Sequence, residues 1–215
     1  MLLSVAIEPQ AIEPQLMPKI VNSDQYRKEL LRKAFDLLAE KGYAQVTTRQ
    51  LSKELGISTG AMYHYFPSKQ ALFEQLVEEL GQQDAVALQE QVAAVDALTE
   101  RLQRLGQFLI DNEAYFVKQT AIWIDFCMNV DAEEVSNNAV FNQVEERYWE
   151  AIAHALKLHD RSLVQFVWTL VNGVLMEQVG GSNRINFAEQ VHLLIDMLTV
   201  YLEARSVDSP SDKGG

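Results

Sequence analysis

The sequence predicts an all-α protein, in which an N-terminal three-helix domain of the helix-turn-helix type precedes a larger C-terminal helical domain, with about nine helices in all. Two observations predict this fold class. The stretch Thr47–Lys69 has the pattern of two short helices joined by a tight glycine turn. From Asp96 onward, every segment keeps a helical period of apolar residues, and no alternating strand pattern competes with it. The chain has 215 residues, 48% of them hydrophobic, which is enough to bury a core.

The first helix is expected over residues 24–41, where apolar residues form one stripe and Gly42 ends the helix. In the next helix, Thr47 and Gln50 have the spacing of a capping box. Gly56 stands where a left-handed C-terminal residue is needed. These signals place a short helix between Thr47 and Gly56.

A second short helix is expected over residues 59–66, because Ser58 can cap its start and Pro67 lacks the N–H that would continue it. In a helix pair of this geometry, the second helix enters the major groove of DNA. Thr59 and Gly60 at its start are small, which would allow a close approach to base edges.

A fourth helix is expected from Lys69 to about residue 92, and Gly81 marks a point where it could break. This helix would link the helix-turn-helix domain to the rest of the chain. Asn186 is placed to cap the last helix. The further helices are expected at about residues 97–111, 114–129, 133–158, 161–179 and 188–205.

The N-terminal pattern also resembles a known family. It is similar to the N-terminal DNA-binding domain of the TetR (tetracycline repressor) family over roughly residues 24–75. The resemblance implies a helical regulatory domain after the DNA-binding domain, and a homodimer. The residues that carry it are Thr47-Thr48-Arg49, Leu51, Leu55-Gly56-Ile57-Ser58, Gly60, Tyr63, Tyr65-Phe66, Lys69 and Leu72-Phe73.

Residues that would contact DNA follow from this pattern. Arg49 has the fork that suits guanine, and Thr59, Gly60 and His64 are the expected readers of base edges. Lys69 is expected to meet phosphate, because a cation at a helix start opposes the helix dipole unless an anion is near. The alternatives are a half-buried Tyr63 ring that packs on the first helix and a Lys69 that is merely solvated at the helix start. The full predicted set is Thr47, Thr48, Arg49, Ser58, Thr59, Gly60, Tyr63, His64, Tyr65 and Lys69, with Thr48, Ser58, Tyr63, Tyr65 and Lys69 as phosphate contacts.

The charge is distributed unevenly, although the net charge of the whole chain is −12. Residues 19–70 carry nine Lys and Arg against five Asp and Glu, whereas residues 71–215 carry nine against twenty-three. A basic patch on an acidic body is the electrostatic footprint of a phosphate-binding surface. The distribution therefore favours DNA binding by the N-terminal domain.

The last two predicted helices are apolar on more than one face, so each needs more than one burial surface. Two such helices from each of two subunits can form a four-helix bundle about a twofold axis. We therefore predict a homodimer. The predicted interface residues are Phe166, Leu170, Val174, Leu194, Leu198 and Tyr201.

A small-molecule pocket is expected in the central helices, where aromatic residues gather beside a few polar groups. A plain helical core has the same pattern and is the alternative. Asp125 and Asn172 are the expected polar contacts. The predicted lining residues are Phe116, Gln119, Trp123, Phe126, Cys127, Trp149, Trp168 and Asn172.

The sequence predicts no enzyme, no cofactor and no metal site. Glu189 and His192 form a single pair at helical spacing, whereas a di-iron site needs two such pairs. Cys127 has no basic neighbour that would lower its pKa, so it is expected to be an inert thiol. One cysteine and no run long enough to span a membrane favour a cytoplasmic protein.

The expected function is that of a sequence-specific transcriptional regulator, a homodimer on a pseudo-palindromic DNA operator, acting as a repressor that an unidentified small-molecule effector releases. Two alternatives stay open: a constitutive DNA-binding regulator without an effector, and an enzyme built on a helix bundle. Met17 is an alternative translation start to Met1. The expected domains are a disordered arm at 1–22, the helix-turn-helix domain at 23–75, a regulatory and dimerisation domain at 76–205 and a disordered tail at 206–215.

Overall fold

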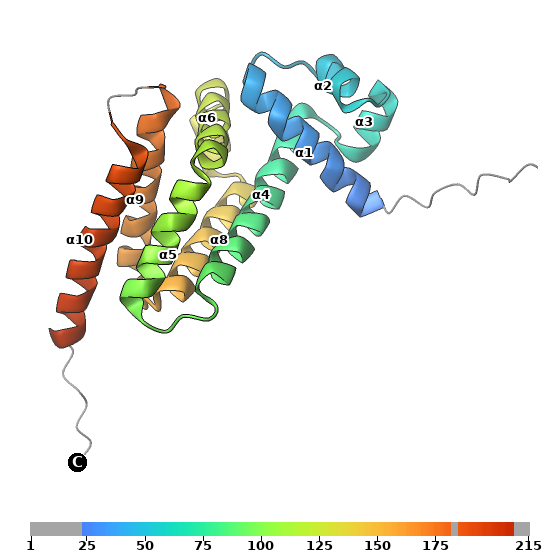
Figure 1. The fold of residues 1–215 in the computed structure, drawn as a ribbon. Helices are drawn as coiled ribbons and strands as arrows, with labels where there is room; N and C mark the ends of the chain where they lie inside the picture. Colours follow the sequence, from blue (N-terminus) through green and yellow to red (C-terminus); the bar gives the residue numbers. More distant parts are fainter. Residues whose placement is uncertain (1–22, 182–184, 209–215) are drawn as a thin grey trace, which may run out of the picture.

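The computed structural model describes residues 23–181 and 185–208, and these form ten helices without a strand. The all-α prediction is therefore confirmed. Figure 1 shows α1, α2 and α3 together at one end, with α4 running from them into a body of packed helices. The predicted N-terminal arm, the alternative start at Met17 and residues 209–215 of the predicted tail lie outside the described residues. The helices are α1 Ser23–Lys41, α2 Thr48–Leu55, α3 Thr59–Tyr65, α4 Lys69–Val92, α5 Leu98–Asp111, α6 Glu113–Asn129, α7 Ala132–Ser136, α8 Ala139–Leu156, α9 Arg161–Val179 and α10 Phe187–Asp208.

The helix boundaries of the N-terminal part arise from the expected local signals. The Thr47 hydroxyl accepts a hydrogen bond from the N–H of Gln50 at 3.3 Å, and the Gln50 side chain accepts one from the N–H of Thr47 at 2.8 Å. Gly56 ends α2 in the left-handed conformation, with φ 71°. The hydroxyl of Ser58 caps α3 and that of Ser68 caps α4. These caps satisfy helix-end groups that would otherwise have no partner.

The first hydrophobic core lies between the N-terminal helices and the body. It contains buried residues of α1 to α3 and of the first turns of α4, together with residues of α6 and α8. The Phe73 ring of α4 stacks on the Phe126 ring of α6 with centroids 4.2 Å apart. The helix-turn-helix unit therefore rests on the body through a shared core, and not only through the chain connection.

Helix α4 crosses both the predicted domain boundary at residue 75 and Gly81 without a break. A Cβ atom built on Gly81 would lie 2.6 Å from Cγ1 of Val144 in α8. The glycine therefore permits the close approach of α8 to α4, and the possible break at this residue is not observed.

The single helix expected at residues 133–158 is two helices in the structure. Asn138 ends the connection between α7 and α8, since its side-chain oxygen accepts hydrogen bonds from the N–H groups of Val140 and Phe141. Its amide nitrogen donates to Glu74 of α4 at 2.7 Å. This tertiary contact stabilises the chain turn, which the helical periodicity of the sequence could not show.

The last helix is longer than predicted, because α10 continues to Asp208, past the predicted end at residue 205.

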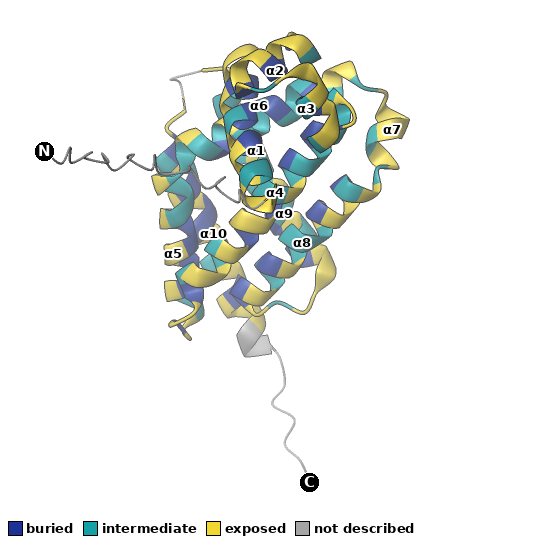
Figure 2. Ribbon diagram, turned by 90° about the vertical axis from the view of Figure 1, so that its right-hand side faces the viewer, coloured by how far each residue is buried: buried dark blue, intermediate teal, exposed yellow. Residues whose placement is uncertain are grey.

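The second hydrophobic core lies inside the body, between α4, α5, α6, α8, α9 and α10. Figure 2 shows buried residues along the inner sides of these helices, while the outer sides of α2 and α7 are exposed. The chain therefore has two cores in sequence along α4 and α6, one beneath the helix-turn-helix unit and one around the body.

Candidate functional site

The outer surface of α2 and α3 presents most of the predicted DNA-contacting residues. The side chain of Tyr63 is 50% exposed. The small residues at the start of α3 leave its first turn open. Exposed members of the predicted set are Thr47, Arg49, Ser58, Thr59, Gly60, Tyr63 and His64.

The inner side of α3 carries a buried methionine. Met62 is fully buried, and its sulfur lies 3.2 Å from the hydroxyl of Ser52 in α2. The single hydroxyl hydrogen of Ser52 can instead be donated to the carbonyl of Thr48 in its own helix, at 2.9 Å. Because Met62 points inward, the residues that follow it, Tyr63 and His64, point outward. The buried Met62 thus helps to set which side of α3 faces outward.

The remaining three members of the predicted set, Thr48, Tyr65 and Lys69, are only partly accessible. Thr48 is half-buried at the start of α2. The ring of Tyr65 packs edge-on against Tyr26 of α1, with centroids 5.7 Å apart. Tyr65 therefore contributes to the packing of α3 on α1 as well as to the outer surface.

Lys69 occupies a different position from the one predicted. Its ammonium group donates to the carbonyl oxygens of Tyr43 at 3.0 Å and Val46 at 3.1 Å, and it lies 4.2 Å from the centre of the Tyr43 ring. Partial burial lowers the pKa of Lys69, and the nearby Asp125 carboxylate acts in the opposite direction. Carbonyl oxygens thus surround the ammonium where the sequence predicts a phosphate. Lys69 joins α4 to the α1–α2 connection and is neither a solvated residue nor directed at the outer surface.

The same connection is held from the body by Asp125 of α6. Its carboxylate accepts a hydrogen bond from the N–H of Ala44 at 2.9 Å. A Cβ atom on Gly42 would lie 3.1 Å from that carboxylate, and Gly42 has φ 80°. Asp125 was predicted as a polar contact in the ligand pocket, but the structure places it against the helix-turn-helix unit instead.

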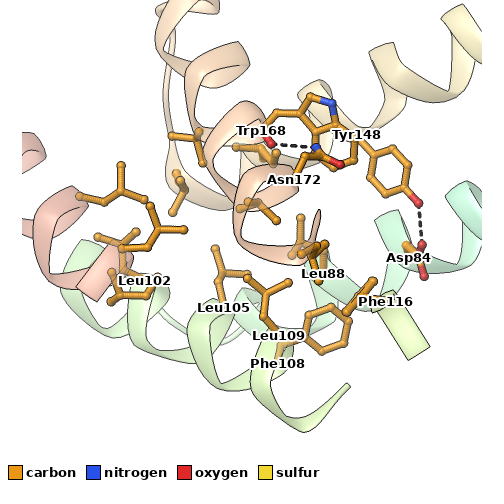
Figure 3. A pocket seen from close by; sticks show the side chains of 18 of the residues that line it. Asp84, Leu88, Leu102, Leu105, Phe108, Leu109, Phe116, Tyr148, Trp168 and Asn172 are labelled. Carbon is orange, nitrogen blue, oxygen red and sulfur yellow. Dashed lines mark hydrogen bonds between the residues drawn. The ribbon is translucent and has the colours of Figure 1, made fainter. Parts of the chain in front are cut away.

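A cavity of about 120 Å³ lies in the body between α4, α5, α6, α8, α9 and α10 (Figure 3). Four of the eight predicted pocket residues line it: Phe116, Gln119, Trp168 and Asn172. Most of the wall is leucine, isoleucine and valine. The body thus contains a cavity with mostly apolar walls, and half of the predicted lining residues do not line it.

The other four predicted residues lie elsewhere for identifiable reasons. Trp123, Phe126 and Cys127 belong to the last turns of α6, which pack into the first core beneath α1 to α3. Burial raises the pKa of the Cys127 thiol. Trp149 lies on α8 beneath the guanidinium of Arg161, which is 5.0 Å from the ring centre. Only the first half of α6 reaches the cavity.

The residue that sequence reasoning missed is Asp84 of α4. This carboxylate is only 7% exposed and lines the cavity. It accepts hydrogen bonds from the hydroxyls of Tyr115 at 2.8 Å and Tyr148 at 2.5 Å and from the amide of Gln119 at 3.0 Å. Burial raises the pKa of Asp84, while these three donors act in the opposite direction. The signal in the sequence was an acidic residue one turn before Leu88, on the apolar face of a helix that runs through the body.

The outer face of α9 and α10 exposes large apolar side chains. Phe166 is 56% exposed and Tyr201 is 48% exposed, as a predicted interface would require, while Leu170 and Val174 are half-buried. Leu194 and Leu198 were also predicted there, but they are buried and line the cavity. A rotation of about 100° per residue places their neighbours on the outer side instead. The exposed apolar residues of α10 are Leu193, Met197, Val200 and Tyr201.

Two further features bear on the kind of protein this is. None of the helices in residues 23–181 and 185–208 combines the length and apolar character that a membrane crossing requires. Within the same residues, no group of three His, Cys, Asp or Glu side chains is arranged to hold a metal ion.

Comparisons with known proteins agree with this architecture. Residues 30–76 match the model of the bacterial regulatory proteins of the tetR family. Nucleoid occlusion factor SlmA of Haemophilus influenzae is 31% identical over 104 residues, which are 48% of this chain and 45% of that protein. The aligned part of the chain thus spans less than half the length of this relative.

Solved structures share the fold over most of the chain. A transcriptional regulator from Saccharomonospora viridis, in complex with choline, has a TM-score of 0.68 and 18% identity, and the match covers 82% of this chain and 97% of that one. A tetR-family regulator from Streptomyces coelicolor has a TM-score of 0.66 and 20% identity, covering 87% and 85%. The helix-turn-helix segment of this chain, residues 30–76, thus matches the tetR family of bacterial regulatory proteins, and the helical architecture of the whole is similar to that of the solved regulators.

Proposed function

We propose that the protein binds double-stranded DNA through α2 and α3 and thereby regulates transcription. The observation that carries this proposal is the open first turn of α3, where Thr59 and Gly60 are exposed and nothing bulky prevents contact with base edges. His64 lies one turn further on the same outer surface. Thr59, Gly60 and His64 would read bases, and Arg49 at the start of α2 would meet guanine or phosphate.

Phosphate contacts would come from the residues that flank this surface. The hydroxyl of Tyr63 and the side chains of Thr47 and Ser58 are exposed around α3, and Thr48 and Tyr65 are partly accessible. Lys69 is removed from the direct contacts, since its ammonium is engaged by two carbonyl oxygens. Its proposed role is to keep α4 and the α1–α2 connection in register, so that α2 and α3 face the DNA together.

The DNA-bound form would be a homodimer formed through α9 and α10. The exposed apolar residues of these helices, among them Phe166, Met197 and Val200, would be buried in a four-helix bundle. A Cβ atom added to Gly173 of α9 would meet no heavy atom within 4 Å, so another backbone can approach there. A twofold axis through this bundle would present two α3 helices to a pseudo-palindromic operator.

A small-molecule effector in the cavity would act on the DNA-binding surface along two helices. In α4, Asp84 lines the cavity, and Lys69 lies about 22 Å from it along the helix axis, at the start of the same helix. Along α6, Gln119 in the cavity precedes Asp125 by about 9 Å. Both helices therefore end on the α1–α2 connection, so a shift of either one would tilt the α2–α3 surface. The effector must bind the tilted state more tightly than the DNA-bound state for release to occur.

The test begins with nuclease footprinting of the DNA that flanks the protein's own reading frame. Fluorescence anisotropy on the protected sequence and on single-base variants then measures affinity for the wild type, for Thr59→Val and His64→Gln, and for the control Glu90→Gln, which alters an exposed residue of α4. We expect the first two variants to lose about 1–3 kcal/mol of discrimination at particular base pairs, and the control to behave as the wild type. Equal affinity of the wild type for the protected sequence and for unrelated DNA would refute sequence-specific binding.

A substitution that fills the cavity distinguishes effector-dependent repression from constitutive DNA binding. Replacing Val171 on the cavity wall with Trp would fill the space without touching the DNA-binding surface. If the regulator needs an effector, this variant should bind the operator and should no longer be released by cell extract that releases the wild type. Release of neither protein by any extract would support the constitutive alternative.

A further inference from the structure

The polar groups of the cavity gather at one end. Figure 3 shows Asp84 and Tyr148 at that end and Leu102 at the other, with leucines and phenylalanines between them. Asp84 uses three hydrogen-bond donors, from Tyr115, Gln119 and Tyr148. A carboxylate offers about four lone-pair sites, so one more donor can be accepted. A ligand in the cavity would therefore meet a carboxylate at one end and hydrocarbon elsewhere.

The charge of Asp84 has no cation to balance it among the residues that line the cavity. No Lys, Arg or His belongs to that wall. All three groups that hold the carboxylate are neutral donors, and burial opposes its ionisation. Removing a carboxylate from water without an opposite charge is costly. A positively charged ligand would remove part of this cost, whereas a negatively charged one would increase it.

The aromatic residues beside Asp84 suit the same kind of ligand. The rings of Tyr148 and Trp168 stack with centroids 4.6 Å apart and an interplanar angle of 19°. Phe116 also lines the cavity, close to Asp84 in Figure 3. Aromatic faces attract ammonium groups, most strongly where water is excluded. Carboxylate and aromatic faces together form a site that favours a cation.

We propose that the effector of this protein is an apolar amine, whose protonated nitrogen pairs with Asp84 and whose hydrocarbon part extends toward Leu102. This inference rests on the proposed function of the cavity as the effector site and specifies the ligand's class. A cavity of about 120 Å³ is close in size to engineered cavities of about 150 Å³ that hold benzene. A six-carbon amine therefore matches the space without rearrangement of the helices.

The experiment compares three ligands that share a six-carbon apolar part and differ in their polar group. Isothermal titration calorimetry at pH 7 measures the binding of n-hexylamine, n-hexanol and n-hexanoate to the full-length protein, without DNA. We expect hexylamine to bind about tenfold to hundredfold more tightly than hexanol, because the ammonium adds an opposite charge to the hydrogen bond with the carboxylate, whereas the hydroxyl is a neutral donor. Hexanoate should bind more weakly than hexanol. Equal binding of amine and alcohol, tighter binding of the acid, or binding of none of the three would overturn the proposal.

Substitutions then test whether the carboxylate of Asp84 causes the preference for the amine. Asp84→Asn keeps the shape of the side chain and should make hexylamine and hexanol bind equally, while Glu90→Gln removes the same charge from an exposed position of α4 and should keep the preference. Tyr148→Phe removes one donor from Asp84, should keep the preference for the amine, and guards against an Asp84 variant that fails to fold. A retained preference in folded Asp84→Asn would refute the role of the carboxylate. Because none of these titrations contains DNA, failure of this inference is distinct from failure of DNA binding.

Discussion

The close contact between α4 and α8 at Gly81 predicts that the effect of Gly81→Ala on the free energy of unfolding changes sign with the residue at position 144. Gly81→Ala places a methyl group 2.6 Å from Cγ1 of Val144, which is far inside van der Waals contact. Val144 is buried and β-branched, so its rotamer cannot easily change. Helix α4 or α8 must therefore shift, or the Val144 side chain must leave its preferred rotamer.

The magnitude follows from two opposing contributions. Overpacking a core costs about 1–3 kcal/mol, while replacing glycine by alanine inside a helix gains about 1 kcal/mol. Gly81→Ala alone should therefore destabilise the protein by up to about 2 kcal/mol. In a Val144→Ala background, which itself loses about 2–3 kcal/mol, the clash is absent. Gly81→Ala should then stabilise by about 1–2 kcal/mol, because it keeps the helix gain and refills part of the space.

The assay is urea unfolding, followed by circular dichroism, of the wild type, both single variants and the double variant. Because the stability of the proposed dimer would depend on concentration, all four are measured at one protomer concentration. The expected coupling energy is about 2–3 kcal/mol, within the range of residues in direct contact. If Gly81→Ala stabilises both backgrounds by the same amount, the close packing of α4 on α8 is not what requires glycine.

Three further predictions follow from the same structure. Lys69→Met should lower the free energy of unfolding in urea by about 1–2 kcal/mol but leave the salt dependence of DNA affinity unchanged. Arg49→Met should instead lower the slope of that salt dependence by about one. A reduced slope for Lys69→Met would show that Lys69 contacts phosphate. Met197→Glu should yield a monomer in size-exclusion chromatography with light scattering, whereas Met128→Glu, at a methionine that is 80% exposed on α6, should stay dimeric; two dimers would exclude this face. The raised pKa of Asp84 means that the folded state resists its ionisation, so wild-type stability should fall relative to Asp84→Asn as the pH rises above the ordinary aspartate value of 3.8. Unfolding of both proteins between pH 4 and 7 measures this difference, and a constant difference would contradict the assigned shift.

Local signals in the sequence were sufficient for the helix-turn-helix region. The capping box at Thr47, the left-handed Gly56 and the cap at Ser58 each depend on residues within three or four positions along the chain. The same is true of Asn186, whose side chain accepts a hydrogen bond from the N–H of Glu189 at 3.0 Å. Interactions of such short range are readable from a single sequence, because the chain itself brings the partners together.

Long-range contacts were not readable in the same way. Lys69 was assigned to phosphate because its place at a helix start was visible, while the carbonyl groups of Tyr43 and Val46 that receive its ammonium are more than twenty residues away. Trp123 and Phe126 were assigned to the pocket because aromatic residues gather in α6, but that helix extends across two cores. The composition of a helix does not show which of its turns faces which core.

Sequence alone thus determined the class of this protein: the short helices of the helix-turn-helix region, the uneven charge and the apolar last two helices depend on local pattern and composition. Tertiary structure alone decided where the cavity lies, that the carboxyl group of Asp84 stands at one end of it, and that Leu194 and Leu198 face inward while Met197 faces outward. The physical reason is that helical periodicity defines faces within each helix, whereas the packing of α4, α6, α8, α9 and α10 decides which face meets a core, a cavity or solvent.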